Sequence, residues 1–241
     1  MSGNAFKEHI ISRVTYDDYL EIKDAVSYIF SEPCKEIGSS QFFENGKIGD
    51  RTLGDIDFAI QLPKEQIKKV VQSDPFFKEM KVCGNTVSTM VQVGHSKFHV
   101  DFMPSSNIQD ESWIMTSGSE KIKGVVRNMM LCYLANVQNV KESTEGRTIK
   151  HTIAFPNGIA TATNGIKSDR NTSPSVILST LGLDNSRESI ERARTFEGLL
   201  EVLEDAQSHL EGFYQYTRTS NLYHKQPSVL NDGLEFLRNF E

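Results

Sequence analysis

Three aspartates lie in two apolar segments of the chain that have the composition of β-strands. Asp55 and Asp57 stand in LGDIDFAI, and Asp101 stands in FHVDFMP. Because residues two apart on a strand project from the same face, we expect the first two carboxylates to lie side by side. If the second strand pairs with the first, Asp101 adds a third carboxylate, and hard divalent cations prefer such oxygen ligands. The sequence therefore predicts a metal site, with Mg²⁺ as the first candidate ion.

An ordinary surface turn is the alternative interpretation, because isolated Asp-x-Asp pairs are common there. The flanking residues favour the metal site. Both segments are apolar and β-prone, and neither contains Lys or Arg as a counter-charge. Burying an unpaired carboxylate in such a strand would cost several kcal/mol, which a bound cation would offset.

A helix and a glycine-serine turn precede these strands. Residues 16–30 carry apolar side chains close to a 3.6-residue period, which predicts an amphipathic helix. Gly38 and Ser39 follow it. Such a turn can present backbone N–H groups and a hydroxyl to phosphate oxygens, although most Gly-Ser pairs are simple turns.

This order of elements resembles the polymerase-beta nucleotidyltransferase superfamily, and most closely the palm of the family X polymerases. In that superfamily the Gly-Ser turn holds a triphosphate, and three carboxylates bind two magnesium ions. The resemblance implies that Asp55, Asp57 and Asp101 are catalytic residues and ligands of two Mg²⁺ ions, with Mn²⁺ as a substitute. It also implies that Gly38 and Ser39 contact the β and γ phosphates.

The resemblance extends over residues 16–185. The segment WIMTSGS, followed by the helix-like KIKGVVRNMMLCYLANV, is similar to a T-G-S motif and an Arg-bearing helix of the family, and SPSVILSTLGL is similar to its short terminal helix. By this resemblance Ser117 and Gly118 border the sugar and base. Arg127 and Lys121 are secondary candidates for contacting the triphosphate.

The chain departs from the family in two places. The segment between the Gly-Ser turn and the first aspartate is lengthened by QFFENGKIGDRT. Only about fifteen residues precede the first predicted helix. We therefore expect no N-terminal DNA-binding domain, and efficient gap filling on DNA is not expected.

The function implied is transfer of a nucleoside monophosphate from a nucleoside triphosphate, ATP among them, to a hydroxyl, with release of pyrophosphate. The leading acceptor is a nucleic-acid 3′ end, either tRNA, another RNA or a short DNA primer. Two alternatives stay open. One is nucleotidylation of a protein or a small molecule, and the other is a noncatalytic nucleotide-binding module.

The predicted fold class is α+β. We expect a nucleotidyltransferase palm over residues 1–140, with a mixed sheet flanked by helices, and a smaller hairpin and helical region over 141–241. Beyond the first helix we expect a helix at 64–72 and a hairpin from TVSTMVQV to KFHVDFM. A second hairpin is expected through RTIKHTIAF and IATATNGI, followed by a helix capped by Ser173 with Pro174 at its first position. One long amphipathic helix is expected at 186–216 and a last helix at 227–240.

Composition is that of a folded enzyme. The chain has 241 residues with 38% hydrophobic content, which is enough for a sizeable core. No apolar run reaches the roughly 18 residues of a membrane span, and MSGNAFKEHIISR lacks the apolar centre of a signal peptide. We therefore expect no membrane partner and a location in the cytoplasm, or in that of an infected host.

Charge, cysteines and histidines limit the partners further. A net charge of −6 argues against a broad nucleic-acid-binding face, although local Lys and Arg clusters remain available to a triphosphate or a short strand. Three widely spaced cysteines predict neither a disulfide framework nor a zinc knuckle. His95 and His99 have ligand spacing beside Asp101, and both a metal role and a surface or packing role fit them.

Overall fold

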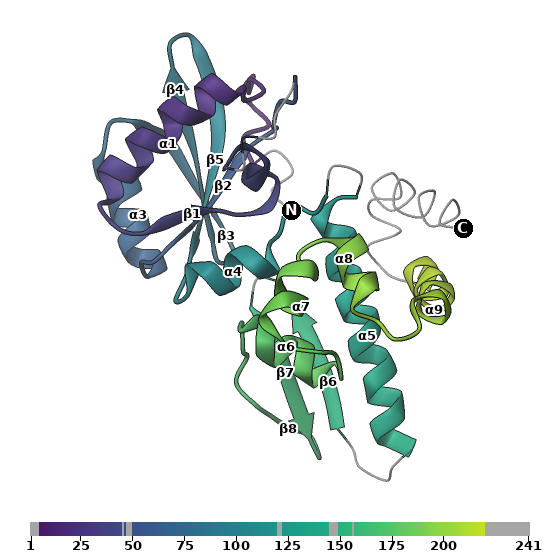
Figure 1. Ribbon diagram of the computed structural model, residues 1–241. Helices are drawn as coiled ribbons and strands as arrows, with labels where there is room; N and C mark the ends of the chain where they lie inside the picture. Colours follow the sequence, from purple (N-terminus) through teal and green to yellow (C-terminus); the bar gives the residue numbers. More distant parts are fainter. Residues whose placement is uncertain are drawn as a thin grey trace. The chain divides into compact units, whose positions relative to one another are not determined.

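The computed structural model describes residues 5–44, 46, 50–119, 122–144, 149–155 and 157–219. The chain divides between Ser112 and Trp113 into two compact units, and Figure 1 shows the first in purple to teal and the second in teal to yellow. The fold is α+β, as predicted. The boundary between the two compact units lies earlier in the chain than the boundary predicted between residues 1–140 and 141–241. The functional roles of those two regions stay a prediction.

The first unit is built on one five-stranded mixed sheet. Its strands are β1 (Cys34–Glu36), β2 (Ile56–Ile60), β3 (Phe77–Cys83), β4 (Thr86–Val93) and β5 (Ser96–Pro104), in the spatial order β1-β2-β5-β4-β3. Strands β2 and β5 pair in parallel, while the other neighbours are antiparallel. The predicted hairpin of β4 and β5 is confirmed, and its return strand lies directly beside the strand that carries Asp57.

Strand alternation gives this sheet one apolar and one polar face. Ile56 pairs with Val100 and Phe58 pairs with Phe102, and all four side chains are fully buried. Helices α1 (Tyr16–Phe30) and α3 (Lys64–Ser73) pack their apolar residues into the same hydrophobic cluster. Because alternate residues point the opposite way, Asp57 and Asp101 belong to the other face.

Helix α1 begins and ends where its sequence favours a boundary. Thr15 caps the first turn, since its hydroxyl accepts from the backbone N–H of Asp18 while the Asp18 carboxylate accepts from the backbone N–H of Thr15. The helix ends at Ser31, which adopts the left-handed conformation with φ of 53°. The predicted helix at 16–30 is therefore confirmed. The predicted helix at 64–72 corresponds to α3, which extends one residue further.

Helix α4 (Ile108–Ile114) carries a buried carboxyl group, Glu111, close to the division between the units. Burial raises the pKa of Glu111 from its ordinary 4.5 to about 7, although the nearby Ser105 side chain and Ser106 backbone oppose the shift. Because the folded pKa lies above the unfolded one, folding favours the protonated form. The contribution of this group to stability is therefore lost as the pH rises from about 4.5 to about 7.

Glu111→Gln is expected to remove this pH dependence. The amide has the size of the neutral acid, so the variant should match the wild type near pH 4.5 and exceed its free energy of unfolding above pH 7, by about 3 kcal/mol at most. Urea denaturation at the two pH values measures the difference. An equal gain at both pH values would show that the carboxyl group does not titrate as its burial requires.

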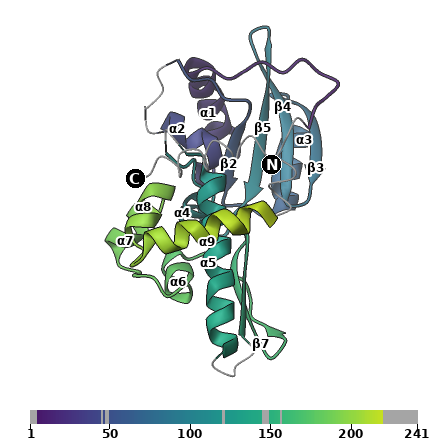
Figure 2. The same ribbon diagram turned by 90° about the vertical axis from the view of Figure 1, so that its right-hand side faces the viewer.

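The second unit packs helices against a small antiparallel sheet. Its elements are α5 (Gly124–Thr144), β6 (Ile149–Ala154), β7 (Gly158–Thr163), β8 (Ile166–Lys167), α6 (Pro174–Thr180), α7 (Arg187–Arg192), α8 (Phe196–Glu201) and α9 (Ala206–Thr219). Strand β6 lies along α5, and Figure 2 shows α9 crossing α5. The predicted second hairpin is β6 and β7, and α6 begins at Pro174 as expected, although the Ser173 side chain makes no capping hydrogen bond.

The single long helix predicted at 186–216 is wrong, because three helices occupy that range. Their buried apolar residues all enter one hydrophobic cluster, so the helical period in the sequence is real even though the axis changes direction. The first break follows α7. There the Thr195 hydroxyl accepts from the Gly198 backbone N–H at 3.0 Å and starts α8. A side chain on Gly198 would lie 2.0 Å from the Arg192 carbonyl oxygen, so the turn is too tight for any other residue.

Two further predictions concern a helix at the end of the chain and the absence of a membrane span. The predicted helix at 227–240 lies outside the described residues. Among the helices that the structure describes, none combines the length and apolar character needed to cross a membrane.

Candidate functional site

The polar face of the first sheet brings together the three aspartates singled out in the sequence. Asp57 on β2 stands directly opposite Asp101 on β5 in parallel register. Asp55 precedes β2, two residues before Asp57. One side-chain ligand atom each of Asp55, Asp101 and His99 lie within 4.8 Å of one another. The site is therefore a compact group of carboxylates with one imidazole, built by two neighbouring strands.

Repulsion between the negative charges of the three aspartates affects the pKa of Asp57. Its pKa is raised well above the ordinary value, chiefly because burial disfavours the ionised carboxylate and further because the charges of Asp55 and Asp101 lie nearby. A divalent cation would relieve both effects, since it supplies positive charge where the oxygens converge. The donor set, mainly carboxylate oxygens, fits Mg²⁺ or Mn²⁺.

The predicted phosphate-binding turn lies against the same carboxylate. Gly38, Ser39 and Ser40 form a short 3₁₀ turn after β1. The Ser40 hydroxyl accepts from the backbone N–H of Asp57 at 2.8 Å, and the backbone N–H of Ile37 donates to the Asp57 carbonyl oxygen at 3.0 Å. The backbone N–H and the carbonyl oxygen of Asp57 therefore both bond to residues of the turn segment and hold it against the strand.

Gly38 is needed at this position for two reasons. Its φ of +58° lies in the left-handed region that other residues rarely adopt. A side chain there would also lie 3.1 Å from the Asp57 carboxylate oxygen Oδ2. The glycine therefore leaves open the space directly beside the carboxylate, where a phosphate and its metal ion would have to approach.

A buried polar group supports the turn from α1 and β1. The Glu36 carboxylate accepts from the Tyr19 hydroxyl and pairs with the Lys23 ammonium at 2.7 Å. One residue after the turn, the Gln41 side-chain amide donates to the Ser112 carbonyl oxygen at 2.8 Å. These contacts fix the chain on both sides of Gly38, so the turn is held before any ligand binds.

His99 is the imidazole of the group, and it is buried with 3% of its surface exposed. It stands two residues before Asp101 on β5 and so faces the same side of the sheet. Its Nε2 atom lies 2.8 Å from Asp101 Oδ1. His95, by contrast, lies at the exposed turn between β4 and β5. Of the two histidines with ligand spacing, the structure brings only His99 to the aspartates.

The other predicted nucleotide-binding residues belong to the second unit, apart from Lys121, which lies outside the described residues. Ser117 and Gly118 form a tight loop before α5. The backbone N–H of Gly124 donates to the Ser117 carbonyl oxygen at 2.9 Å, and Gly118 has a φ of +84°. The predicted contact of Ser117 and Gly118 with the sugar and base stays a prediction.

Arg127 on α5 is fully buried in the core of the second unit. Its guanidinium lies over the Trp113 ring, with Cζ 3.8 Å from the ring centroid. Nε donates to the Ala193 carbonyl oxygen at 2.9 Å, and Nη1 donates to the Asn128 side chain at 2.9 Å. Burial lowers the pKa of Arg127 to about 9. A contact with a triphosphate would require this part of the core to open.

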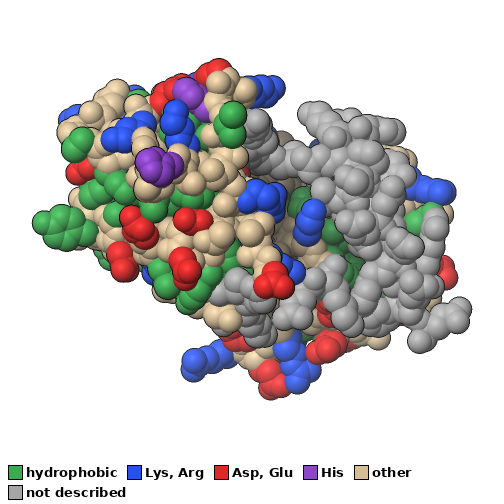
Figure 3. All heavy atoms as spheres, turned by 90° about the horizontal axis from the view of Figure 1, so that it is seen from above, with side chains coloured by type: hydrophobic (Ala, Val, Ile, Leu, Met, Phe, Trp, Pro, Cys, Tyr) green, Lys and Arg blue, Asp and Glu red, His purple; other side chains and the backbone are tan. Residues whose placement is uncertain are grey.

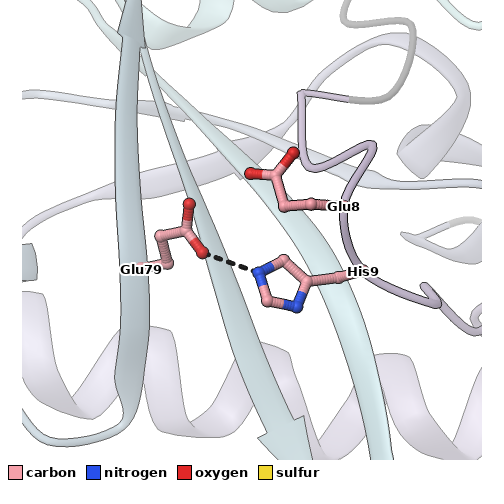
Figure 4. Close-up of side chains that lie close together, drawn as sticks. All are labelled: Glu8, His9 and Glu79. Carbon is pink, nitrogen blue, oxygen red and sulfur yellow. Dashed lines mark hydrogen bonds and ion pairs between the residues drawn. The ribbon is translucent and has the colours of Figure 1, made fainter.

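A second group with possible metal ligands joins the N-terminal segment to β3. Figure 4 shows Glu8, His9 and Glu79, with a hydrogen bond of 2.9 Å between His9 Nε2 and Glu79 Oε2. The Lys81 ammonium contacts the Glu8 carboxylate and lies 3.5 Å from Glu79. Because Lys81 already supplies positive charge to both carboxylates, we interpret this group as an ion-pair network.

A shallow hollow of about 350 Å³ lies next to this network. It is lined by Glu8, His9, Ile10, Ser12, His95 and Lys97. Figure 3, which views the molecule from above, shows His side chains beside Lys and Arg side chains on this face. Both signs of charge meet in the hollow, so it has no preference for an anion or a cation.

Ser40 and Phe6 support the aspartate site and are not among the residues predicted from the sequence. The Ser40 hydroxyl bonds the Asp57 backbone, and the Phe6 ring packs edge-on against His99 with centroids 5.2 Å apart. The serine next to the Gly-Ser pair was a usable signal. Phe6 gave none, because its contact joins residues 93 positions apart and follows no local pattern.

Comparison with known proteins adds little to this geometry. No protein-family model matches the chain, and no curated protein matches it. Among solved structures the chain is similar to one described as "Crystal structure of an antigenic nucleotidyltransferase-like protein from Paracoccidioides brasiliensis". The identity is 12%, the match covers 92% of this chain and 94% of that chain, and the TM-score is 0.31. Since a TM-score of this size establishes neither family nor activity, function is inferred from the aspartate site itself.

Proposed function

We propose that this chain is a metal-dependent nucleotidyltransferase that moves a nucleoside monophosphate from a nucleoside triphosphate to a hydroxyl group and releases pyrophosphate. The observation that carries the proposal is the pairing of Asp57 with Asp101 across parallel strands, with Asp55 close to Asp101 and Gly38 against Asp57. Carboxylates placed near one another and beside an open glycine turn suit an ion-bound triphosphate.

Each residue of the site has a role in this reaction. Asp55 and Asp57 would hold two divalent ions, and Asp101 would hold the ion nearest the acceptor. Such ions, when bound, neutralise the charge that builds on the phosphate oxygens. The open space beside Gly38 admits the β and γ phosphates, and Ser39 offers them its hydroxyl and backbone N–H.

The transfer itself requires a proton acceptor. The acceptor hydroxyl attacks the α-phosphorus, a new P–O bond forms, and the bond to the pyrophosphate oxygen breaks. The proton of the hydroxyl passes to a carboxylate oxygen of Asp101, which is the candidate base because it is placed next to the entering oxygen in this assignment. We propose a nucleic-acid 3′ end as the acceptor, with a protein or a small molecule as the alternatives.

Labelled substrates test both the reaction and its acceptor. The purified chain is incubated with each α-labelled nucleoside triphosphate and Mg²⁺, with total cellular RNA, a DNA primer or a protein extract as separate acceptors. The proposal predicts label in the RNA or DNA pool with the wild type and none with Asp55→Ala. Label in protein alone would identify a protein nucleotidylase. No label in any pool, with nucleotide binding intact, would indicate a noncatalytic module.

A further inference from the structure

The hydrogen bond between His99 and Asp101 fixes one oxygen of a proposed metal ligand. As a metal ligand Asp101 is ionised and its oxygens only accept hydrogen bonds, so in that role the His99 Nε2 atom is the donor of this contact, which is 2.8 Å long. The torsion that turns an aspartate carboxylate about its last bond has broad minima. A donor bonded to Oδ1 therefore decides how Asp101 presents its oxygens to an ion.

His99 is in turn held by an aromatic ring from the start of the chain. Phe6 packs edge-on against the imidazole, with an interplanar angle of 83°, and no part of its surface is exposed. The Lys81 ammonium lies 4.9 Å from the centroid of the Phe6 ring. Lys81, Phe6, His99 and Asp101 thus form a continuous row of contacts across the polar face of the sheet.

Phe6 belongs to residues 5–14, which we call the N-terminal strap. Several contacts hold this strap against the sheet. The strap is held by the His9 to Glu79 bond that Figure 4 shows, and by the contact of Glu8 with Lys81. Further along, the Ser12 backbone N–H donates to the Lys97 carbonyl oxygen at 2.8 Å. None of these contacts involves the three aspartates, so Phe6 is positioned independently of any metal ion.

We propose that His99, backed by Phe6 of the N-terminal strap, is a positioning residue that orients the Asp101 carboxylate for metal binding. The inference rests on the proposed function, because it assumes that Asp101 is a metal ligand. A hydrogen-bonding partner behind a ligand typically contributes about 10- to 100-fold to metal affinity. In this role His99 acts through Asp101, because its Nε2 is bonded to the carboxylate and is not available to the ion.

Mn²⁺ binding to the full-length chain tests this role without any substrate. The titration is followed by electron paramagnetic resonance of free Mn²⁺ for the wild type, His99→Met and His99→Gln. The methionine keeps the volume of the imidazole and removes the donor, so its affinity should fall about 10- to 100-fold. Glutamine offers an amide N–H at a similar reach and should bind within a few-fold of the wild type. His95→Gln, at the exposed turn, is the matched control and should bind as the wild type does.

A third variant keeps the test decisive if His99→Met does not fold. Phe6→Leu retains an apolar side chain but removes the flat ring edge against the imidazole, so it should weaken Mn²⁺ binding several-fold while the His99 donor remains. Circular dichroism confirms that each titrated variant is folded. Unchanged affinity in His99→Met, or in Phe6→Leu where the methionine variant does not fold, would overturn the inference.

The outcomes separate this inference from the proposed function. If His99→Gln loses as much affinity as His99→Met, the imidazole is a direct ligand and the positioning role is wrong. If the wild type binds Mn²⁺ no better than Asp57→Asn does, the metal site itself is wrong, and both proposals fall together. If the wild type binds Mn²⁺ and His99→Met binds it equally well, only the inference drawn here fails.

Discussion

Asp57→Asn is expected to abolish nucleotidyl transfer while leaving the protein at least as stable as the wild type. The amide keeps the shape of the side chain but removes a negative charge from the ion site. Loss of several kcal/mol of metal-mediated stabilisation corresponds to a fall in kcat on the order of 10³-fold or more. Stability should not suffer, because burial and the charges of Asp55 and Asp101 already disfavour the ionised Asp57.

Parallel measurements of turnover and melting test this expectation. Mg²⁺ should raise the melting temperature of the wild type and should have little effect on Asp57→Asn, since only a folded chain with an intact site gains from ion binding. Asp24→Asn, an exposed substitution on α1, is the matched control and should behave as the wild type in both assays. Retained turnover in Asp57→Asn would show that the carboxylate group is not the reaction centre.

Gly118→Ala is expected to destabilise the second unit by about 3 kcal/mol or more. The glycine has a φ of +84°, and a Cβ atom there would lie 2.2 Å from the Ile122 carbonyl oxygen and 2.4 Å from the Gly124 backbone nitrogen. Backbone strain accounts for about 1–2 kcal/mol of the expected loss. The remainder comes from displacement of the loop before α5, because backbone atoms cannot move aside as a flexible side chain would.

Gly165→Ala separates the two causes. Gly165 has the same φ of +84°, but nothing lies within 4 Å of the Cβ atom that alanine would add. This variant should therefore lose only the strain contribution, about 1–2 kcal/mol. Urea denaturation of both variants gives the difference. Equal losses would show that the contacts of Gly118 do not restrict the loop and that its backbone conformation alone is the reason for the glycine.

Local patterns were sufficient to predict α1, β2, α3, β4 and β5 of the first unit. The helix at 16–30 follows from its apolar period, and the β4–β5 hairpin follows from two alternating segments around a Gly-His turn. Both depend on contacts between residues close in sequence. The three helices in place of the predicted helix at 186–216 show the limit of this reasoning, because a period of 3.6 residues reports which side is buried and not whether the axis continues.

Residue type and spacing predict Asp55, Asp57 and Asp101 as one group of carboxylates, and the family resemblance adds the Gly38 turn to that group. Only the tertiary structure decided how they meet, because parallel pairing of β2 with β5 sets Asp57 opposite Asp101 across 44 residues of chain. Tertiary packing also places Phe6 against His99 and buries Arg127 against Trp113. Contacts of this kind arise from the packing of distant segments, and no local period or propensity encodes them.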